Sequence, residues 1–279
     1  MAPADRASAV RERPVNGAAA RSRRVLLAPA IVAITACAAR APATAVVTQP
    51  QPAARQLVVV ITPGWDSTSG TLRRFVRADE DAPWQRADKA VPIVVGRTGL
   101  AWGAGFDSYA APGSPTAGPV KREGDGRSPA GIFPITAAFG FAPADSVRDV
   151  RLPYLQLTPG IECVDDTASS HYNAVVDRGS VPLVDWQTSE RMREVPVYRL
   201  GVIVGYNTRP TLRARGSCIF FHIWNGPRST TVGCTAMAAP ELERLVAWLD
   251  PRAHPAVVQL SAAAYDTLRA GWQLPALDP

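Results

Sequence analysis

A histidine and a cysteine in one stretch of the chain are the residues whose types and spacing suggest chemistry. His222 ends an otherwise apolar strand, and Cys234 follows Gly233 in a turn twelve residues later. A strand end, a loop and a return fit within that distance, so the two side chains can meet. Taken singly, such a histidine is more often a hydrogen-bonded core residue, and such a cysteine is more often buried and inert.

Together the two residues indicate a cysteine nucleophile with a histidine base. A free thiol has a pKa of about 8.5, so only a few per cent is thiolate near neutrality. A neighbouring histidine takes the thiol proton and then stabilises the thiolate by its own charge. Gly233 permits a tight turn whose backbone N–H groups face one point, and such donors stabilise the oxyanion of an acyl-transfer reaction. The pattern predicts acyl transfer or hydrolysis through Cys234.

Metal and nucleotide chemistry find little support. A zinc site needs three or four clustered ligands, and the three histidines of the chain have no paired spacing. No Gly-Lys-Ser/Thr ending follows Gly124 and Gly126, so a phosphate-binding loop is not indicated. We therefore expect no metal and no cofactor.

The net charge of +6 comes from the N-terminus. Residues 1–24 carry six arginines against two acidic residues, and Arg40 and Arg55 add two positive charges. From Leu57 onward 22 basic residues balance 22 acidic ones. Because nucleic-acid binding needs a basic footprint on the folded domain, we expect no nucleic-acid partner.

Residues 1–36 have the layout of a secretory signal peptide. Arginines precede the apolar run 25–36, which is shorter than the roughly 20 residues that span a bilayer. The sequence Ile34-Thr35-Ala36-Cys37 resembles a bacterial lipobox, which implies a lipid on Cys37; ordinary cleavage nearby is the alternative. The Ala- and Pro-rich residues 37–56 are typical of a flexible tether. We expect an exported protein of the periplasm or cell envelope, lipid-anchored to a membrane.

The elements that must position the candidate pair are mostly strands. With 26 Pro and 21 Gly in 279 residues, the composition favours a loop-rich β protein. Residues 57–279 are expected to form one β-dominated domain with helices at its periphery, over about 240–249 and 262–270. The expected strands are β-branched or aromatic runs bounded by turns, at residues 57–61, 72–76, 91–96, 131–135, 154–158, 198–205, 218–223 and 257–260.

The expected export also determines how we expect the cysteines to pair. If Cys37 carries lipid, three cysteines remain and one of them has no partner in the chain. An oxidising compartment favours a disulfide, and we expect it between Cys163 and Cys218. Two buried free thiols are the alternative.

Two segments resemble the bacterial L,D-transpeptidase (YkuD-type) catalytic domain, and the likeness extends over most of residues 57–260. The first is the glycine-rich turn and strand at 123–135, Glu-Gly-Asp-Gly-Arg-Ser-Pro-Ala-Gly-Ile-Phe-Pro-Ile. The second is Phe220-Phe221-His222 followed by the segment 231–235, Thr-Val-Gly-Cys-Thr. The two occur in the order found in that family.

The resemblance implies a single β-sandwich domain that cleaves and transfers peptidoglycan stem peptides. Cys234 would be the nucleophile and His222 the base and then the acid, with the Ile223 carbonyl orienting the imidazole. The N–H groups of Gly233 and Cys234 would form the oxyanion hole. D-Ala would leave, and the acyl group would pass to an amine.

Three departures from the family motif leave the acyl acceptor open. Val232 stands where the family usually has a second histidine, Ala236 where it often has an arginine, and the His–Cys spacing is short. Water instead of an amine would make the chain an L,D-carboxypeptidase or a wall amidase. A non-catalytic, lipid-anchored wall-binding protein is the alternative from another class.

Five further residues are candidates for substrate contact. Each has a simpler interpretation: solvated loop charge, turn chemistry around 162–173, or the wall of a core or cleft. The five are Arg127, His171, Tyr172, Trp224 and Thr231.

Overall fold

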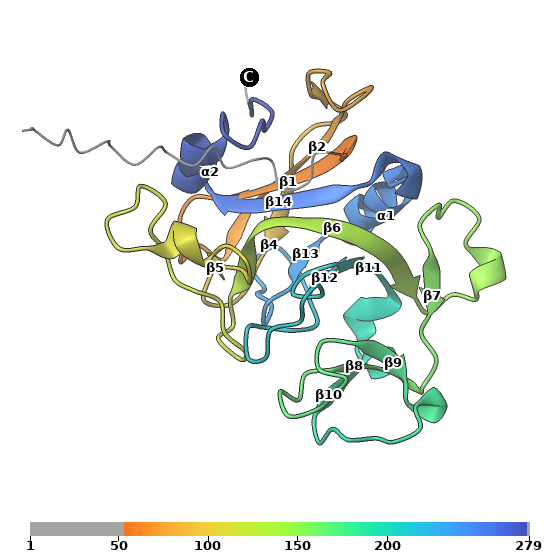
Figure 1. Cartoon of the computed structure of the whole chain (residues 1–279). Coiled ribbons are helices and arrows are strands. Elements are labelled where there is room, and N and C mark those ends of the chain that lie inside the picture. The colour runs from red at the N-terminus through yellow and green to blue at the C-terminus, as the bar shows by residue number, and fades with distance from the viewer. Residues whose placement is uncertain (1–52, 278–279) are drawn as a thin grey trace, which may run out of the picture. The chain divides into compact units, whose positions relative to one another are not determined.

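The β-branched runs of the chain build a sheet that closes on itself (Figure 1). The computed structural model describes residues 53–277. The expected signal peptide, Cys37 and nearly all of the expected tether lie outside the described residues. Within them, no helix has the length and apolar character needed to cross a bilayer.

Eight strands form a closed barrel of mixed direction. Closure comes from β2, which pairs with β4 on one side and with β1 on the other. The pairs β1–β14 and β12–β13 are parallel, and the other barrel pairs are antiparallel. In pairing order the strands are β1 (Gln56–Thr62), β14 (Ala256–Ser261), β6 (Ser128–Gly140), β11 (Leu200–Val204), β12 (Phe220–Ile223), β13 (Thr235–Met237), β4 (Val91–Val94) and β2 (Ser69–Val76).

Shorter elements extend the barrel. Three short strands pair at its edges: β3 (Gln85–Arg86), β5 (Leu100–Trp102) and β7 (Tyr154–Gln156). Short 3₁₀ helices lie in the connections: η1 (Asp107–Ala110), η2 (Ala144–Ser146), η3 (Arg178–Ser180) and η6 (Pro251–Ala253).

Two α-helices flank β14 along the chain, and Figure 1 shows them at its two ends. α1 (Ala239–Trp248) begins with a proline in its first turn, as expected, and buries Leu242, Leu245 and Val246. α2 (Ala262–Leu268) is capped by the Ser261 hydroxyl, which accepts a hydrogen bond from the Ala264 N–H. The expected helices are therefore confirmed, the second ending two residues early.

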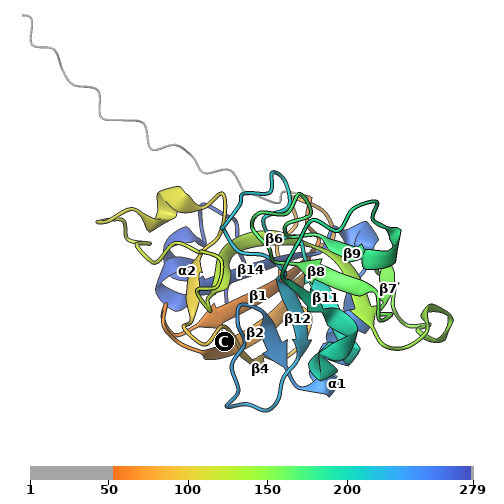
Figure 2. The ribbon, with the colours of Figure 1, turned by 90° about the horizontal axis from the view of Figure 1, so that it is seen from below.

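A second, three-stranded sheet lies on the β11–β12 side of the barrel (Figures 1 and 2). Its order is β10 (Ser189–Arg191), β8 (Ile161–Val164) and β9 (Val175–Asp177). The 3₁₀ helices η4 (Met192–Glu194) and η5 (Pro196–Arg199) follow it and contact β8 and β12. We call these five elements the cover.

Alternation along β12 separates two hydrophobic clusters. Phe221 and Ile223 belong to the large cluster inside the barrel, whereas Phe220 belongs to a smaller cluster beneath the cover. His222 is on the same side as Phe220 and packs edge-on against Tyr198 of η5, with the ring centres 5.2 Å apart. The outer face of β12 is thus buried as well as the inner one.

The mainly β fold with a few peripheral helices and one disulfide is confirmed. The strands close into a barrel, where the family resemblance implied a sandwich, because β1 pairs with strands from both ends of the domain. The expected strand at 218–223 begins only at Phe220, since Cys218 has a φ of 55°, which breaks an extended chain. The expected strand at 198–205 begins at Leu200, because Tyr198 belongs to η5.

The disulfide between Cys163 and Cys218 fastens the cover to the barrel. Replacing both cysteines by serine should lower the free energy of unfolding by about 4 kcal/mol, because the cross-link spans 55 residues. Urea denaturation of the full chain measures the loss. The control is Cys234→Ser, which removes a cysteine but no cross-link and should cost less. Equal losses in the two variants would contradict a stabilising cross-link.

Candidate active site

The Cys234 thiol is buried where the parallel strands β12 and β13 meet. His222 pairs with Ala236 in this register, so Cys234 lies level with Phe220. The Phe220 N–H donates a hydrogen bond to Sγ (3.3 Å), and the thiol donates to the Cys218 carbonyl (3.4 Å). It is the free cysteine among the described residues.

The resting thiol is protonated. Burial, and then the negative charge of Glu190, raise the pKa of Cys234 to about 12. The hydrogen bond from the Phe220 N–H, the nearby Tyr198 hydroxyl and the charge of Lys121 act in the opposite direction, but they do not outweigh burial. The thiolate that the expected chemistry requires is therefore not the resting form of Cys234.

His222 is held by the backbone of its neighbour. Its Nδ1 lies 2.7 Å from the Ile223 carbonyl oxygen, which is the orienting contact that the resemblance implies. Burial lowers the pKa of His222, and the bond to Ile223 only partly offsets this, so the imidazole is neutral. A neutral imidazole that donates through Nδ1 keeps its lone pair on Nε2, the atom that a base uses. Within residues 53–277, no hydrogen bond joins this imidazole to the Cys234 thiol.

The turn before Cys234 is closed by Thr231. The Gly233 N–H donates to Thr231 Oγ1 (3.1 Å), and the Thr231 hydroxyl donates to the Cys234 carbonyl (2.6 Å). The Ser128 hydroxyl donates to the same carbonyl (2.9 Å). Gly233 must release Thr231 before its N–H can serve the oxyanion role implied by the resemblance.

Two residues that the sequence analysis missed stand beside the thiol. Tyr198 of η5 donates a hydrogen bond to Glu190 Oε2 of β10 (2.8 Å), and its hydroxyl lies close enough to Cys234 to lower the pKa of the thiol. Burial raises the pKa of Glu190 to about 7; the charges of Asp165 and Glu123 add to the increase, and the bond from Tyr198 opposes it. Their positions in the sequence do not indicate that they lie near Cys234, because both residues belong to the cover, which only the fold places against the thiol.

A cavity of about 230 Å³ opens beside the thiol, and half of its twelve lining residues are polar or charged. Val232 is 62% exposed at this cavity, so the motif position where a histidine is usual presents an apolar surface. His222 does not contribute to the lining. The lining residues are Arg97, Lys121, Glu123, Gly124, Asp165, Glu190, Ser217, Cys218, Ile219, Val232, Gly233 and Cys234.

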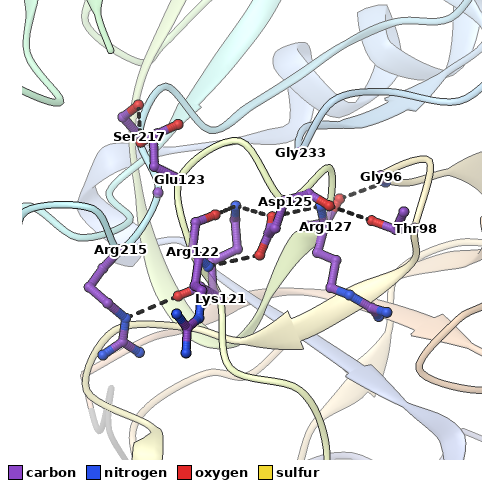
Figure 3. A network of polar contacts seen from close by, with 12 residues as sticks. Gly96, Thr98, Lys121, Arg122, Glu123, Asp125, Arg127, Arg215, Ser217 and Gly233 are labelled. Atoms are coloured by element: carbon purple, nitrogen blue, oxygen red, sulfur yellow. Dashed lines mark hydrogen bonds and ion pairs between the residues drawn. The ribbon is translucent and has the colours of Figure 1, made fainter. Parts of the chain in front are cut away.

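Glu123 and Gly124 of the glycine-rich turn line the cavity, and Figure 3 shows the polar contacts around this turn. Glu123 accepts hydrogen bonds from Ser217 (2.8 Å) and from the Tyr172 hydroxyl of the cover. Asp125 accepts from Lys121 Nζ (2.6 Å) and from the Arg122 and Arg127 N–H groups, as Figure 3 shows for the two N–H groups. The turn is therefore tied to itself and to the segment before β12.

The weaker candidates divide into two groups. Thr231 and Tyr172 contact the site, through the Cys234 turn and through Glu123. Arg127 bonds instead to the Leu100 carbonyl and to Asp66, and His171 lies 3.2 Å from Asp185 within the cover loops. Neither these two nor the half-buried Trp224 lines the cavity.

Comparison with known proteins assigns no family. No protein-family model, curated protein or solved structure matches the chain. In the part of the chain that the structure describes, no group of three or more His, Cys, Asp or Glu is arranged to hold a metal ion. The function must therefore be inferred from the residues around Cys234.

A buried carboxylate holds the cover together. Glu162 of β8 accepts hydrogen bonds from Trp186 Nε1 (2.9 Å) and Ser189 Oγ (2.7 Å) and pairs with Arg178 (3.2 Å). Burial alone would raise the pKa of Glu162, but these hydrogen bonds and the nearby positive charge outweigh it and keep the pKa below 4.5. The ionised form is thus the one that the fold stabilises.

We expect Glu162→Gln to lower the free energy of unfolding at pH 7 by about 1–3 kcal/mol, since hydrogen bonds to a charged group are weakened. A lowered folded-state pKa stabilises the protein above the unfolded pKa, and the gain is lost as the pH falls through the folded value. The difference between variant and wild type should therefore shrink below pH 4.5. Urea titrations between pH 3 and 7, with the exposed Glu194→Gln as control, test this; a constant difference would refute it.

The raised pKa of Cys234 also predicts a slow thiol in the resting protein. At pH 7, iodoacetamide should modify native Cys234 at least about tenfold more slowly than the same cysteine in the urea-unfolded chain, where the pKa is about 8.5. Peptide mapping of Cys234 by mass spectrometry gives both rates. A native rate equal to the unfolded one would mean that burial does not protonate the thiol.

Proposed function

We propose that the chain is a cysteine-dependent acyl transferase of the L,D-transpeptidase type, acting on peptidoglycan stem peptides. The observation that carries the proposal is the combination of a buried free thiol at a cavity with a carbonyl-oriented histidine on the neighbouring strand. The two sequence segments that resemble that family meet at this point: Ser128 of the first bonds to the carbonyl of Cys234 in the second.

In the proposed reaction, Cys234 Sγ attacks the donor carbonyl while its proton passes to a base, His222. The tetrahedral oxyanion is stabilised by N–H donors at Gly233 and Cys234. The C–N bond then breaks, D-Ala leaves with the proton returned by His222, and a thioester remains. An amine of a second stem peptide attacks the thioester, transfers its proton to His222 and releases Cys234.

The charged lining of the cavity suits a peptide more than an apolar substrate. Arg97 is exposed at the cavity, and the Asp165 Oδ1 atom is buried there without a hydrogen-bond partner among the described residues. A ligand that carries both a carboxylate and an ammonium group would find an opposite charge for each. Stem peptides carry such groups.

Hydrolysis is the second candidate, and Val232 and Ala236 favour it. Val232 presents an apolar side chain to the cavity, and Ala236 is buried and offers no polar group. The polar contacts that the histidine and arginine of the family motif would make near the donor or acceptor substrate are therefore missing. Water as acceptor would give an L,D-carboxypeptidase or wall amidase with the same Cys/His pair; a lipid-anchored wall-binding protein without activity remains the non-enzymatic alternative.

Export and anchoring belong to the same proposal. The disulfide between Cys163 and Cys218 supports an oxidising compartment. A signal peptide at 1–36 and a lipid on Cys37 would hold residues 57–279 near the wall. Incorporation of a labelled lipid precursor, with Cys37→Ala as control, tests the anchor; equal labelling of the two proteins would refute it.

The activity is tested with the full chain and a purified disaccharide-tetrapeptide, read by mass spectrometry. We expect a cross-linked dimer that has lost one D-Ala, because the thioester is passed to an amine. Cys234→Ala should abolish the product, and His222→Gln should reduce it by about 10²–10⁴-fold, as loss of a general base does.

The other outcomes separate the alternatives. Monomer that loses D-Ala without joining identifies a hydrolase. No product with wild type, together with wall-fragment binding that Cys234→Ala retains, would replace the enzymatic proposal by a binding role.

A further inference from the structure

The Tyr198 hydroxyl stands between the Cys234 thiol and the Glu190 carboxylate. It donates to Glu190 Oε2 at 2.8 Å and lies close enough to the thiol to lower the pKa of Cys234. The ring is fixed in place by edge-on aromatic contacts on several sides, with centroid distances of 5.2–5.6 Å. These contacts are with Phe139, Phe220 and His222.

The direction in which the Tyr198 hydroxyl donates depends on Glu190. While Glu190 is ionised, the Tyr198 O–H donates to it, so the tyrosine oxygen can only accept a proton from the Cys234 thiol, whose S–H must first turn from the Cys218 carbonyl. When Glu190 is protonated, its O–H donates to Tyr198, and the Tyr198 O–H turns to donate to Sγ. A protonated Glu190 therefore favours the thiolate.

We propose that Tyr198 and Glu190 form a second acid–base path for the Cys234 thiol, beside His222; this rests on the proposed nucleophilic role of Cys234. The S–H bond breaks and its proton passes to Tyr198 Oη, as the Tyr198 O–H proton passes to Glu190 Oε2. The products are a thiolate, a neutral tyrosine and a neutral carboxylic acid. Tyr198 contacts the reacting sulfur, and Glu190 is a positioning residue that acts through it.

The path is suited to a buried site because it conserves the number of charges. One negative charge moves from Glu190 to Cys234, whereas proton transfer to His222 creates a thiolate and an imidazolium together. Burial disfavours both charged groups of that pair. A proton acceptor with a pKa of about 7 is also matched to transfer near neutral pH.

Other charged groups lie around the path from Cys234 through Tyr198 to Glu190 and contribute to its pH dependence. Asp165 and Glu123 act on Glu190, and Lys121, which is paired with Asp125, acts on Cys234. His222 packs on Tyr198, and Arg97 lines the cavity.

The rate of iodoacetamide modification of Cys234, measured between pH 5.5 and 9.5 in the full chain, tests the path. In wild type, the rate should rise with pH up to about 7, where Glu190 loses its proton and becomes able to accept one. Above this pH the rate should level off, because transfer of the thiol proton to Glu190 releases no proton to solvent and so does not depend on pH. In Glu190→Gln the rate should keep rising about tenfold per pH unit, since Gln does not titrate. In Tyr198→Phe the rate on the plateau should fall at least tenfold, since the thiolate loses its O–H donor.

Two matched variants serve as controls. Tyr154→Phe and Glu194→Gln remove the same groups elsewhere, where Tyr154 bonds to the Ala142 carbonyl and Glu194 pairs with Arg191. Both should reproduce the wild-type profile. Near-UV circular dichroism verifies that each variant retains its packing.

Three results would overturn the proposal. A wild-type profile without levelling shows that no such acceptor exists. A Tyr198→Phe profile that matches wild type leaves only a through-space effect of Glu190. Levelling that persists in Glu190→Gln transfers the acceptor role to Asp165, Glu123 or His222. No substrate is used, so failure of the peptidoglycan assay and failure of this path are separate results.

Discussion

β12 and β13 run parallel and side by side, and the register of that pairing sets where the thiol and the imidazole lie. With His222 level with Ala236, Cys234 lies level with Phe220 and accepts its N–H. The alternation of β12 then directs Phe220 and His222 to the outer face, beneath the cover. A register shift of one residue would turn His222 into the barrel core, so the site exists only in this pairing.

The cover buries the outer face of the barrel at β12, beneath which the second hydrophobic cluster lies. It brings Tyr198 and Glu190 to the thiol, and the disulfide and the hydrogen bonds of Glu162 hold it in place. The burial that results keeps Cys234 protonated and His222 neutral. The same elements that shape the cavity therefore determine the protonation states in it.

Local patterns in the sequence predicted much of this arrangement. His222 and Cys234 are close in the chain, and their residue types alone indicate chemistry; β-branched runs and Pro240 located most barrel strands and α1. Barrel closure was not predictable, because β1 pairs with β14, about 200 residues away. Tyr198 and Glu190 were missed because the elements that carry them, η5 and β10, are too short for a periodic signal. The raised pKa of Cys234 was not predictable from the sequence, because it comes from burial, which only the three-dimensional packing reveals.

The protonated resting state of Cys234 has a consequence for a protein that also contains a disulfide. Thiolates, and not thiols, attack disulfides and react with peroxide. Cys218 lines the same cavity as Cys234 and accepts its hydrogen bond through the backbone carbonyl. A permanently ionised sulfur at this position would scramble the nearby Cys163–Cys218 link or oxidise to sulfenic acid. Holding the sulfur as a thiol lets a free cysteine and a structural disulfide coexist in one cluster.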